Sequence, residues 1–490
     1  MSFDMMAPLM FAGLVILLMM GYPVAFSLAA NGLLFAAIGI WHGSLDLVLL
    51  QALPERVLGI MANSTLLAIP FFTFMGLILE RTGMAEELLD TVGQLFGTLR
   101  GGLAYAVVFV GALLAATTGV VAASVLAMGL ISLPVMMRYG YSNRLSTGVI
   151  AASGTLAQII PPSLVLIVLA DQMGASVGDF YEGALFPGLA LAGAYALWVL
   201  IVSLIWPKAA PGCPPEARTL YGTRLVVKVF TAMIPPLILI FLVLGTIFLG
   251  VATPTEGGAM GATGAIAMAL AKRKLSFSLL KQAVESTATM TSFVMFILVG
   301  STVFSLVFRG VDGDLWVEHL LGNLPGGAIG FLIVVNVMIF LLAFFLDYFE
   351  IAFIMVPLLT PVAQKLGIDL VWFGVLLAVN MQTSFLHPPF GFALFYLRSV
   401  APKSVKTMDI YWGAVPFVAI QVLMVGVLIV FPQVVTGNVS HAPGEIKGSG
   451  AEELRRQIEE TPAKAEKAKE GEAPRSDDSA SELERLLKQQ

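Results

Sequence analysis

Long apolar segments follow one another along almost the whole chain, and they limit its possible folds more than any other feature. A helix needs about 20 mainly apolar residues to cross a bilayer, and open sheets cannot span lipid. Charged residues are scarce in these segments: only 38 of the chain's 59 charged residues lie in the first 435 positions. The sequence therefore predicts an all-α polytopic membrane protein. The apolar segments lie near 5–20, 23–40, 57–79, 102–136, 145–170, 184–206, 229–250, 257–271, 283–308, 328–363, 371–397 and 411–433.

The composition excludes several other classes of protein. The single cysteine, Cys213, cannot form the disulfide framework of a small secreted domain. The net charge is −5 and there is no basic face, so nucleic acid is not an expected partner. The four histidines are scattered, and the H-E-x-x-H, G-x-S-x-G and G-x-x-x-x-G-K-[ST] motifs are absent. We therefore expect neither an enzyme nor a protein that ATP drives directly.

Two segments, 102–136 and 328–363, are too long for one span and too short for two. Polar or small residues interrupt each near its middle, at Thr117-Thr118-Gly119 and at Asp347-Tyr348. Two half-depth helices that form a re-entrant hairpin fit this length. The alternative is one long tilted helix followed by a surface helix.

Basic residues fall on alternate loops, which indicates the topology. Lysines and arginines gather near 138–144, 207–228, 272–274 and 398–406, whereas the loops 171–183 and 251–256 have none. Cytoplasmic loops carry an excess of Lys and Arg. We therefore place the basic loops in the cytoplasm.

The chain repeats itself at an offset of 227 residues. The matches run from Leu79 with Leu306 to the Pro161-Pro162 and Pro388-Pro389 pairs, and include Gly83 with Gly310, Pro134 with Pro361 and Gly140 with Gly367. Each copy contains five spans and one hairpin. Because five is odd, the second copy is expected upside down relative to the first. Such inverted repeats are a transporter architecture, with binding near the bilayer midplane between the copies.

The strongest chemical signal is a pair of proline-interrupted segments at 153–163 and 380–391. Proline lacks an amide hydrogen and clashes with the carbonyl four residues back, so adjacent prolines open a helix. The freed carbonyls can bind a cation, and the half-helix after the prolines can face an anion. The alternative is a plain kink in which Ser and Thr hydroxyls bond back to the helix. The occurrence of two such sites, related by the repeat, favours a binding site.

Two residues near the second break allow more than one interpretation. Asp347 is a carboxylate in a long apolar run, which makes it a candidate functional residue. The alternatives to a functional role are a place at a hairpin tip that water reaches from outside the membrane, or a role as a helix N-cap. Glu350, three residues on, is expected to be structural. His387 could contact an anionic substrate or donate to a freed carbonyl.

These motifs together resemble the large membrane subunit of tripartite ATP-independent periplasmic (TRAP) transporters. The resemblance covers about residues 5–432, and it rests on segments 21–26, 154–163, 253–256, 345–347 and 382–392. It implies a bacterial inner-membrane permease with two partners: a small four-helix membrane subunit and a periplasmic substrate-binding protein. It also implies sodium-driven import of organic acids by an elevator movement. Sodium ions would couple transport, and no cofactor is implied.

The same resemblance implies where the ions and the substrate bind. One sodium would lie between the first hairpin tip and the first break, and another between the second tip and the second break. The implied sodium ligands are Thr117, Thr118, Gly119, Gly154, Thr155, Asp347, Asn380, Gln382 and Thr383. The substrate would lie between the ions, near Ser153, Gln158, Pro161, Pro162, Ser163, Ser384, His387, Pro388 and Pro389. The first tip departs from the family, since it reads Thr-Thr-Gly where many relatives have Ser-Gly-Ser.

The expected organisation is a permease over 1–433 followed by a charged, disordered tail over 434–490. Repeat 1 covers about 1–206 and repeat 2 about 229–433. The transport domain would comprise about 100–172 and 327–400, with the other spans as scaffold. The nearest alternative is a self-sufficient sodium–dicarboxylate symporter that needs no binding protein. A membrane-embedded enzyme and a structural anchor are the more distant alternatives.

Overall fold

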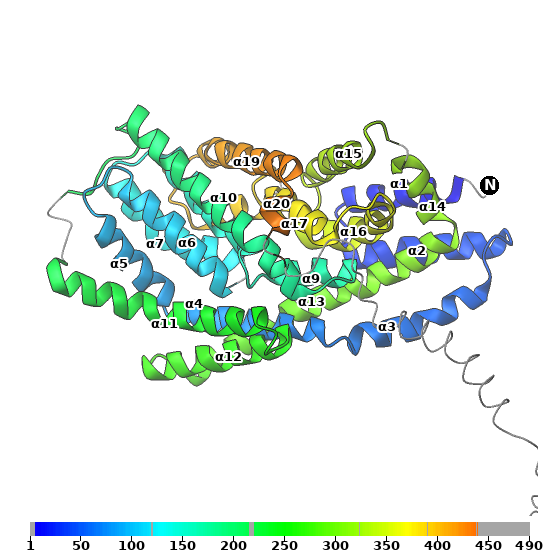
Figure 1. The fold of residues 1–490 in the computed structure, drawn as a ribbon, viewed down its shortest axis with the longest axis horizontal. Coiled ribbons are helices and arrows are strands. Elements are labelled where there is room, and N and C mark those ends of the chain that lie inside the picture. Colours follow the sequence, from blue (N-terminus) through cyan, green and yellow to red (C-terminus); the bar gives the residue numbers. More distant parts are fainter. Residues whose placement is uncertain are drawn as a thin grey trace, which may run out of the picture. The chain divides into compact units, whose positions relative to one another are not determined.

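The computed structural model describes residues 5–118, 121–214, 220–322, 324–389, 391–437 and 439, and within these ranges it contains helices and no strand (Figure 1). The first half comprises α1 (Met6–Met19), α2 (Val24–Trp41), η2 (Leu47–Ala52), α3 (Leu53–Met61), η3 (Thr65–Leu67), α4 (Ala68–Arg81), α5 (Met84–Phe96), α6 (Gly102–Thr118), α7 (Val121–Arg138), α8 (Asn143–Thr155), η4 (Leu156–Gln158), α9 (Leu164–Met173) and α10 (Val177–Ile205). The second half comprises α11 (Gly222–Phe248), α12 (Pro254–Ala271), α13 (Phe277–Gly310), α14 (Gly313–Leu321), α15 (Gly327–Leu342), α16 (Tyr348–Lys365), α17 (Leu370–Met381), η6 (Gln382–Phe385), α18 (Phe392–Val400), α19 (Thr407–Val430) and α20 (Gln433–Thr436). Of the disordered tail expected over 434–490, residues 434–436 are instead part of the short helix α20, and residues 438 and 440–490 lie outside the described residues.

Six described helices are long and apolar enough to cross a membrane by themselves: α2, α7, α10, α11, α13 and α19. A seventh crossing is formed if the bent pair 47–61 and 65–81 counts as one span. This pair bends by 49° where the sequence had indicated one continuous segment over 57–79. The remaining apolar helices are shorter and lie at the hairpins, the breaks and the N-terminus. The prediction of an all-α polytopic membrane protein is confirmed.

Both overlong segments fold as two helices. Residues 102–138 form α6 and α7, which contact each other, and residues 327–365 form α15 and α16. Neither segment is one continuous helix. The choice between a re-entrant hairpin and a tilted spanning helix with a surface helix stays a prediction.

The helix bounds recur at the offset found in the sequence. Adding 227 to the bounds of α7 gives the bounds of α16, and adding it to the first residue of α8 gives the first residue of α17. Gly140 and Gly367, also 227 apart, follow the equivalent helices α7 and α16 with φ angles of +81° and +69°, which glycine adopts without steric cost. The two halves therefore share one order of elements. The inverted orientation of the second copy stays a prediction.

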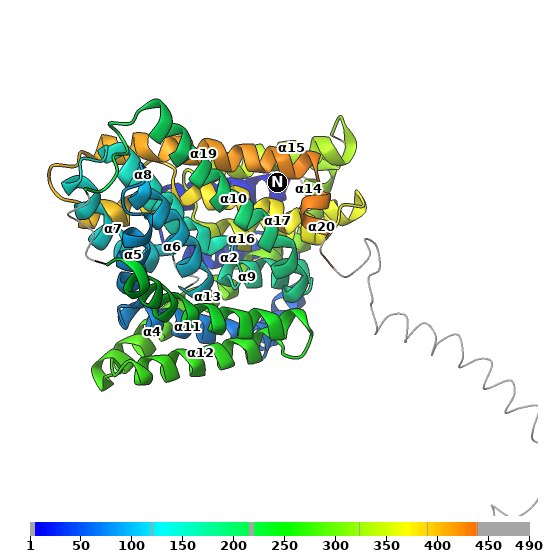
Figure 2. The ribbon, with the colours of Figure 1, turned by 60° about the vertical axis from the view of Figure 1, so that its left-hand side comes forward.

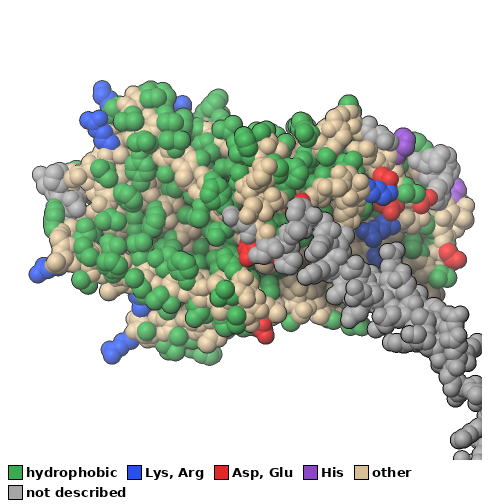
Figure 3. Space-filling model, in the orientation of Figure 1, with side chains coloured by type: hydrophobic (Ala, Val, Ile, Leu, Met, Phe, Trp, Pro, Cys, Tyr) green, Lys and Arg blue, Asp and Glu red, His purple; other side chains and the backbone are tan. Residues whose placement is uncertain are grey.

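The apolar surface and the buried core are both consistent with a membrane protein. Hydrophobic side chains cover most of the face in Figure 3, and the charged ones gather mainly toward its ends. The broken helices form the centre, because every residue of α8 from Leu145 to Thr155 is buried, and so is nearly all of α9. α8 crosses α19 closely: a Cβ added at Gly148 would lie 2.1 Å from the carbonyl oxygen of Gly413. Only glycine allows this approach.

The basic loops lie together. The Ser142 amide donates to the Ala209 carbonyl at 2.9 Å, which joins the segments 139–142 and 206–214. Glu87 of α5 accepts hydrogen bonds from Lys228 at 3.2 Å and Lys272 at 2.6 Å. These contacts hold α5 against α11 and the end of α12, which lie side by side in Figure 2. Loops that were assigned to one side of the membrane thus meet on one side of the protein.

Candidate functional site

The two proline pairs interrupt helices at equivalent places. α8 tightens into η4 and stops before Pro161-Pro162, after which α9 begins at Leu164. α17 tightens into η6 and stops before Pro388-Pro389, after which α18 begins at Phe392. Both Pro-Pro bonds are cis. The predicted helix breaks are confirmed.

The two breaks meet each other inside the protein. The Gln382 side-chain amide donates to the Thr155 hydroxyl at 3.0 Å, and both residues are fully buried. These two residues are 227 positions apart, so each is the repeat equivalent of the other. Equivalent residues can contact each other only where the two copies meet. The hydrogen bond therefore places both breaks at the contact between the copies.

Hydroxyl groups bond to carbonyls that the breaks release. Thr155 donates to Ala152 at 2.8 Å, Thr383 to Asn380 at 2.7 Å, and Ser163 to Gln158 at 2.7 Å. Ser163 is also the N-cap of α9, since its hydroxyl accepts from the amides that follow it. These bonds are the ones that a plain proline kink would make. They use the hydroxyl protons, and a threonine hydroxyl oxygen still has lone pairs with which it can accept, as Thr155 does from Gln382.

Other buried polar atoms at the breaks have no hydrogen-bond partner among the described residues. They are Ser153 Oγ and Gln158 Oε1 at the first break, and Gln382 Oε1 and Ser384 Oγ at the second. The exposed fraction of each of these residues is 5% or less. Leaving a buried polar group unsatisfied costs about 1–3 kcal/mol. A kink alone would not require these atoms, whereas a bound ion or polar ligand would use them.

Close helix contacts place the first hairpin against the first break. A Cβ at Gly111 of α6 would lie 2.5 Å from Ser153 Cβ, and one at Gly154 would lie 2.3 Å from Val125 Cγ2 of α7. Thr117 and Thr118 are the last residues of α6, and their side chains lie outside the described residues, as does Gly119. The structure thus leaves the ligands predicted at the first tip untested.

Asp347 at the second hairpin tip is a helix N-cap. Its carboxylate accepts from the Glu350 amide at 2.7 Å, and the Glu350 carboxylate accepts from the Asp347 amide at 2.8 Å. This is a capping box at the start of α16. The next residue, Tyr348, lies near the second break, with its ring centroid 6.5 Å from that of Phe385. The alternative of an N-cap is confirmed, and a role of Asp347 as a sodium ligand stays a prediction.

His387 lies in an aromatic slot formed by the second hairpin. Its ring stacks on Phe344 with centroids 4.1 Å apart and meets the edge of Phe340 at 4.5 Å. The Ala343 carbonyl lies beside the ring, but neither ring nitrogen makes a well-directed hydrogen bond. The histidine is 2% exposed. The structure therefore fixes where the imidazole lies without assigning a donor role to it.

Sequence reasoning missed two polar contacts that complete the site. The Asn380 amide donates to the carbonyl and the side-chain oxygen of Asn336 in α15, at 2.8 and 2.9 Å. Gln421 of α19 donates to the Tyr195 hydroxyl of α10 at 2.9 Å. A lone Asn in the apolar run of α15 was the available signal for the first contact. The second depends on packing between distant helices, which the sequence does not show.

A polar cavity of about 350 Å³ lies apart from the breaks, between α3, α13, α16 and the end of α9. Arg56 and Arg309 line it, and neither forms an ion pair with a described residue. Asp171 also lines it, but its carboxylate accepts from Asn63 at 2.6 Å and Gln172 at 3.1 Å. The cavity therefore presents two arginines without a carboxylate partner.

Comparison with known proteins identifies relatives over nearly the whole chain. A family model described as "Tripartite ATP-independent periplasmic transporter, DctM component" matches residues 11–434. The "C4-dicarboxylate TRAP transporter large permease protein DctM" of Vibrio cholerae is 29% identical over 88% of this chain and 97% of its own. The "Isethionate TRAP transporter permease protein DctMQ" of Oleidesulfovibrio alaskensis is 28% identical over 82% of this chain and 62% of its own. Among solved structures, the YdaH transporter of Alcanivorax borkumensis aligns with a TM-score of 0.59 and 15% identity, over 79% of this chain and 89% of that chain. This last likeness shows the fold alone.

Proposed function

The chain belongs to the DctM family of TRAP transporter large permeases, and from this membership we propose that it imports a small organic acid that a periplasmic binding protein delivers. A sodium gradient drives the import, and the transport domain moves as an elevator against the scaffold. The protein is a multi-pass inner-membrane permease. Its relatives are permeases rather than enzymes.

One observation carries this proposal: the two helix breaks meet at equivalent residues, Thr155 and Gln382. Buried polar atoms without partners surround the meeting point on both sides. Transporters built from repeats bind their cargo at such broken helices. A structural anchor would have no need for buried, unsatisfied oxygen atoms.

We assign the sodium ions to the hydroxyl, amide and carbonyl oxygens at the breaks. Hard cations prefer oxygen ligands, and the described residues contain no cluster of His, Cys, Asp and Glu that could hold another metal. Gly154 and Thr155 would serve one ion, and Asn380 and Thr383 the other. The hydroxyls of Thr155 and Thr383 donate to carbonyls, so their oxygens act as acceptors: Thr155 accepts from Gln382, and a remaining lone pair of each would take an ion.

The substrate would lie between the ions with its acid group toward α18. This half-helix starts at Phe392 with no side-chain cap on its first amides, and a helix N-terminus attracts an anion. The cavity with Arg56 and Arg309 would provide an earlier contact for the same charge. The named substrates of the two relatives, C4-dicarboxylate and isethionate, are small organic anions.

Two partners complete the proposed system: a small four-helix membrane subunit and a periplasmic binding protein. This chain covers only 62% of the relative named DctMQ, which therefore contains additional sequence beyond a DctM-like part. A separate small subunit would supply that part here. The transport domain would comprise about 100–172 and 327–400. Each sodium charge that enters down the membrane potential gains about 2.3 kcal/mol per 100 mV, enough to offset a sizeable substrate gradient.

The test is uptake of labelled organic acids by proteoliposomes that contain this chain and its small subunit. Each acid is measured with and without an inward sodium gradient, and with and without the cognate binding protein. Uptake that needs both supports the proposal and names the substrate. Uptake with sodium alone would favour the self-sufficient symporter. Chemical conversion of the acid, with no accumulation, would favour an enzyme.

A further inference from the structure

The two repeats place equivalent grooves at opposite ends of the protein. The first groove, of about 240 Å³, lies between α5 and α7, and the second, of about 420 Å³, between α14 and α16. In Figure 1, α5 and α7 lie toward the left and α14 and α16 toward the right. The α7 wall contributes Val135, Arg138 and Tyr139, and the α16 wall contributes the residues 227 positions later, Val362, Lys365 and Leu366.

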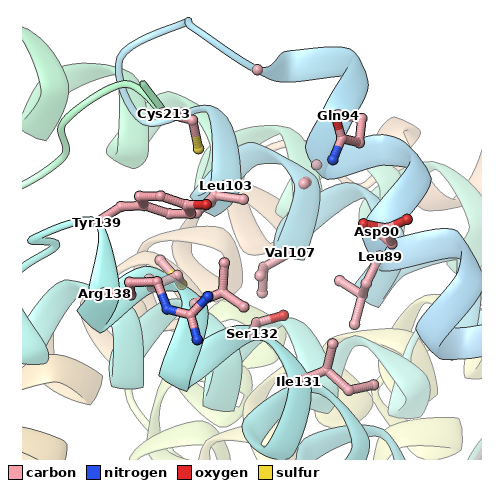
Figure 4. A pocket seen from close by; sticks show the side chains of 15 residues that line it. Leu89, Asp90, Gln94, Leu103, Val107, Ile131, Ser132, Arg138, Tyr139 and Cys213 are labelled. Carbon is pink, nitrogen blue, oxygen red and sulfur yellow. The ribbon is translucent and has the colours of Figure 1, made fainter. Parts of the chain in front are cut away.

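The charges in the two grooves are arranged differently. In the second groove, Lys365 forms an ion pair with Glu318 of α14. In the first, Arg138 occupies the position equivalent to Lys365, and Asp90 of α5 lies across the groove from it (Figure 4). Within the described part of the chain, neither Arg138 nor Asp90 forms an ion pair. Opposite charges thus face each other in both grooves but are joined in only one.

Each pair connects a helix that is held by its neighbours to a helix of a hairpin. Glu87 fastens α5 to Lys228 of α11 and to Lys272 after α12. α14 packs on α1 and α13, where Phe11 and Trp316 bring their rings to 6.3 Å. α7 and α16, by contrast, are the second helices of the two hairpins. A shift of the hairpins relative to α5 and α14 would therefore change both charge separations.

From this asymmetry we propose that Arg138–Asp90 and Lys365–Glu318 are alternating ion pairs, of which one closes as the other opens. With the second copy inverted, as the sequence predicts, the second state exchanges the conformations of the two halves. In that state Arg138 contacts Asp90, and Lys365 separates from Glu318. This inference rests on the two-state movement in the proposed function. It assigns a role to four charged residues that lie outside the ion and substrate site.

Disulfide trapping in membrane vesicles tests the proposal on the full chain with its small subunit. Cys213 lines the first groove, so all variants carry Cys213→Ser. The reporter Asp90→Cys/Arg138→Cys is compared with and without Glu318→Gln, and free thiols are counted after mild oxidation. An exposed ion pair shifts an equilibrium only modestly, so Glu318→Gln is expected to raise the disulfide yield about two- to fivefold. The reciprocal reporter, Glu318→Cys/Lys365→Cys, is expected to respond in the same way to Arg138→Gln.

The matched control is Lys281→Gln, which breaks the Lys281–Glu285 pair at 3.7 Å within α13 and should leave both yields unchanged. An unchanged or lowered yield on Glu318→Gln overturns the proposal. The charge exchange Glu318→Lys/Lys365→Glu guards against misfolding, because it is expected to restore the original Asp90→Cys/Arg138→Cys yield. Trapping requires no substrate, so failure of alternation is separable from failure of uptake. If uptake depends on the binding protein but neither disulfide yield responds to the other ion pair, only this inference is rejected.

Discussion

The hydrogen bond between Thr155 and Gln382 is the contact on which the proposed site depends most. Thr155→Val preserves the shape of the side chain and removes its hydroxyl. The change leaves the Gln382 amide and the Ala152 carbonyl without their partners at 3.0 and 2.8 Å. Both breaks are fully buried at these positions. Each stranded group costs about 1–3 kcal/mol, so the variant is expected to lose about 2–6 kcal/mol of folding free energy.

Adding Gln382→Leu separates stability from function. The second change removes the Gln382 amide that had lost its partner. The double variant is therefore expected to recover about 1–3 kcal/mol of folding free energy relative to the sum of the single changes. Stability is followed by the melting temperature of the solubilised complex. Sodium-dependent uptake is measured in proteoliposomes in parallel. If the two residues belong to the ion site, uptake or its sodium half-saturation stays impaired although stability recovers.

The control is another buried hydrogen bond, which the Asn31 side-chain amide of α2 donates to the Met10 carbonyl of α1 at 2.8 Å. Asn31→Leu is expected to lower the stability and to leave the sodium half-saturation unchanged. An unaltered sodium half-saturation in both Thr155→Val and the double variant would refute the assignment. The contact between the breaks would then be structural only.

Three further outcomes follow from the structure. Asp347→Asn keeps a good N-cap, whereas Asp347→Ala is expected to cost about 0.5–2 kcal/mol of stability. The Asp347→Asn protein should therefore melt near the wild-type temperature and yet lose sodium-dependent uptake. Full uptake by this variant would show that Asp347 serves only as a cap. Burial disfavours the charged form of Glu87, but hydrogen bonds and charges from Lys272 and Lys228 outweigh it, so the pKa of Glu87 lies below its ordinary value. A lowered folded-state pKa stabilises the protein above the unfolded value of about 4.3, and this stabilisation is lost as pH falls through the folded value. Glu87→Gln should therefore lower the melting temperature more at pH 7 than at acidic pH; an equal loss at both would contradict this. Gly148→Ala would bring a Cβ to 2.1 Å from the Gly413 carbonyl oxygen and should prevent stable assembly, whereas Gly193→Ala, at a position with nothing within 4 Å of the added Cβ, should be neutral.

The features predicted correctly from the sequence are those that arise from local physics. Apolar length determines that the chain is a membrane protein, and adjacent prolines interrupt a helix whatever surrounds them. The offset of 227 was readable because helix ends need particular residues, as at Gly140 and Gly367. The N-cap at Asp347 was one of the alternatives that the sequence offered, and the structure adds that Glu350 completes a capping box with it. The bend after α3 was missed because residues 57–79 have the hydropathy of one continuous span.

The contacts of the site depend instead on long-range packing, and the repeat explains how far sequence could reach them. Equivalence of Thr155 and Gln382 follows from the offset, but many other residues also have equivalents 227 positions away. Only equivalent residues that lie where the two copies meet can touch, and the place of that meeting depends on how all the helices pack. The same reasoning applies to charges: Arg138 and Lys365 are equivalent by sequence, yet only the folded chain shows that one is paired and the other is not. The differences between equivalent residues, rather than their likeness, are therefore where the structure adds information about movement.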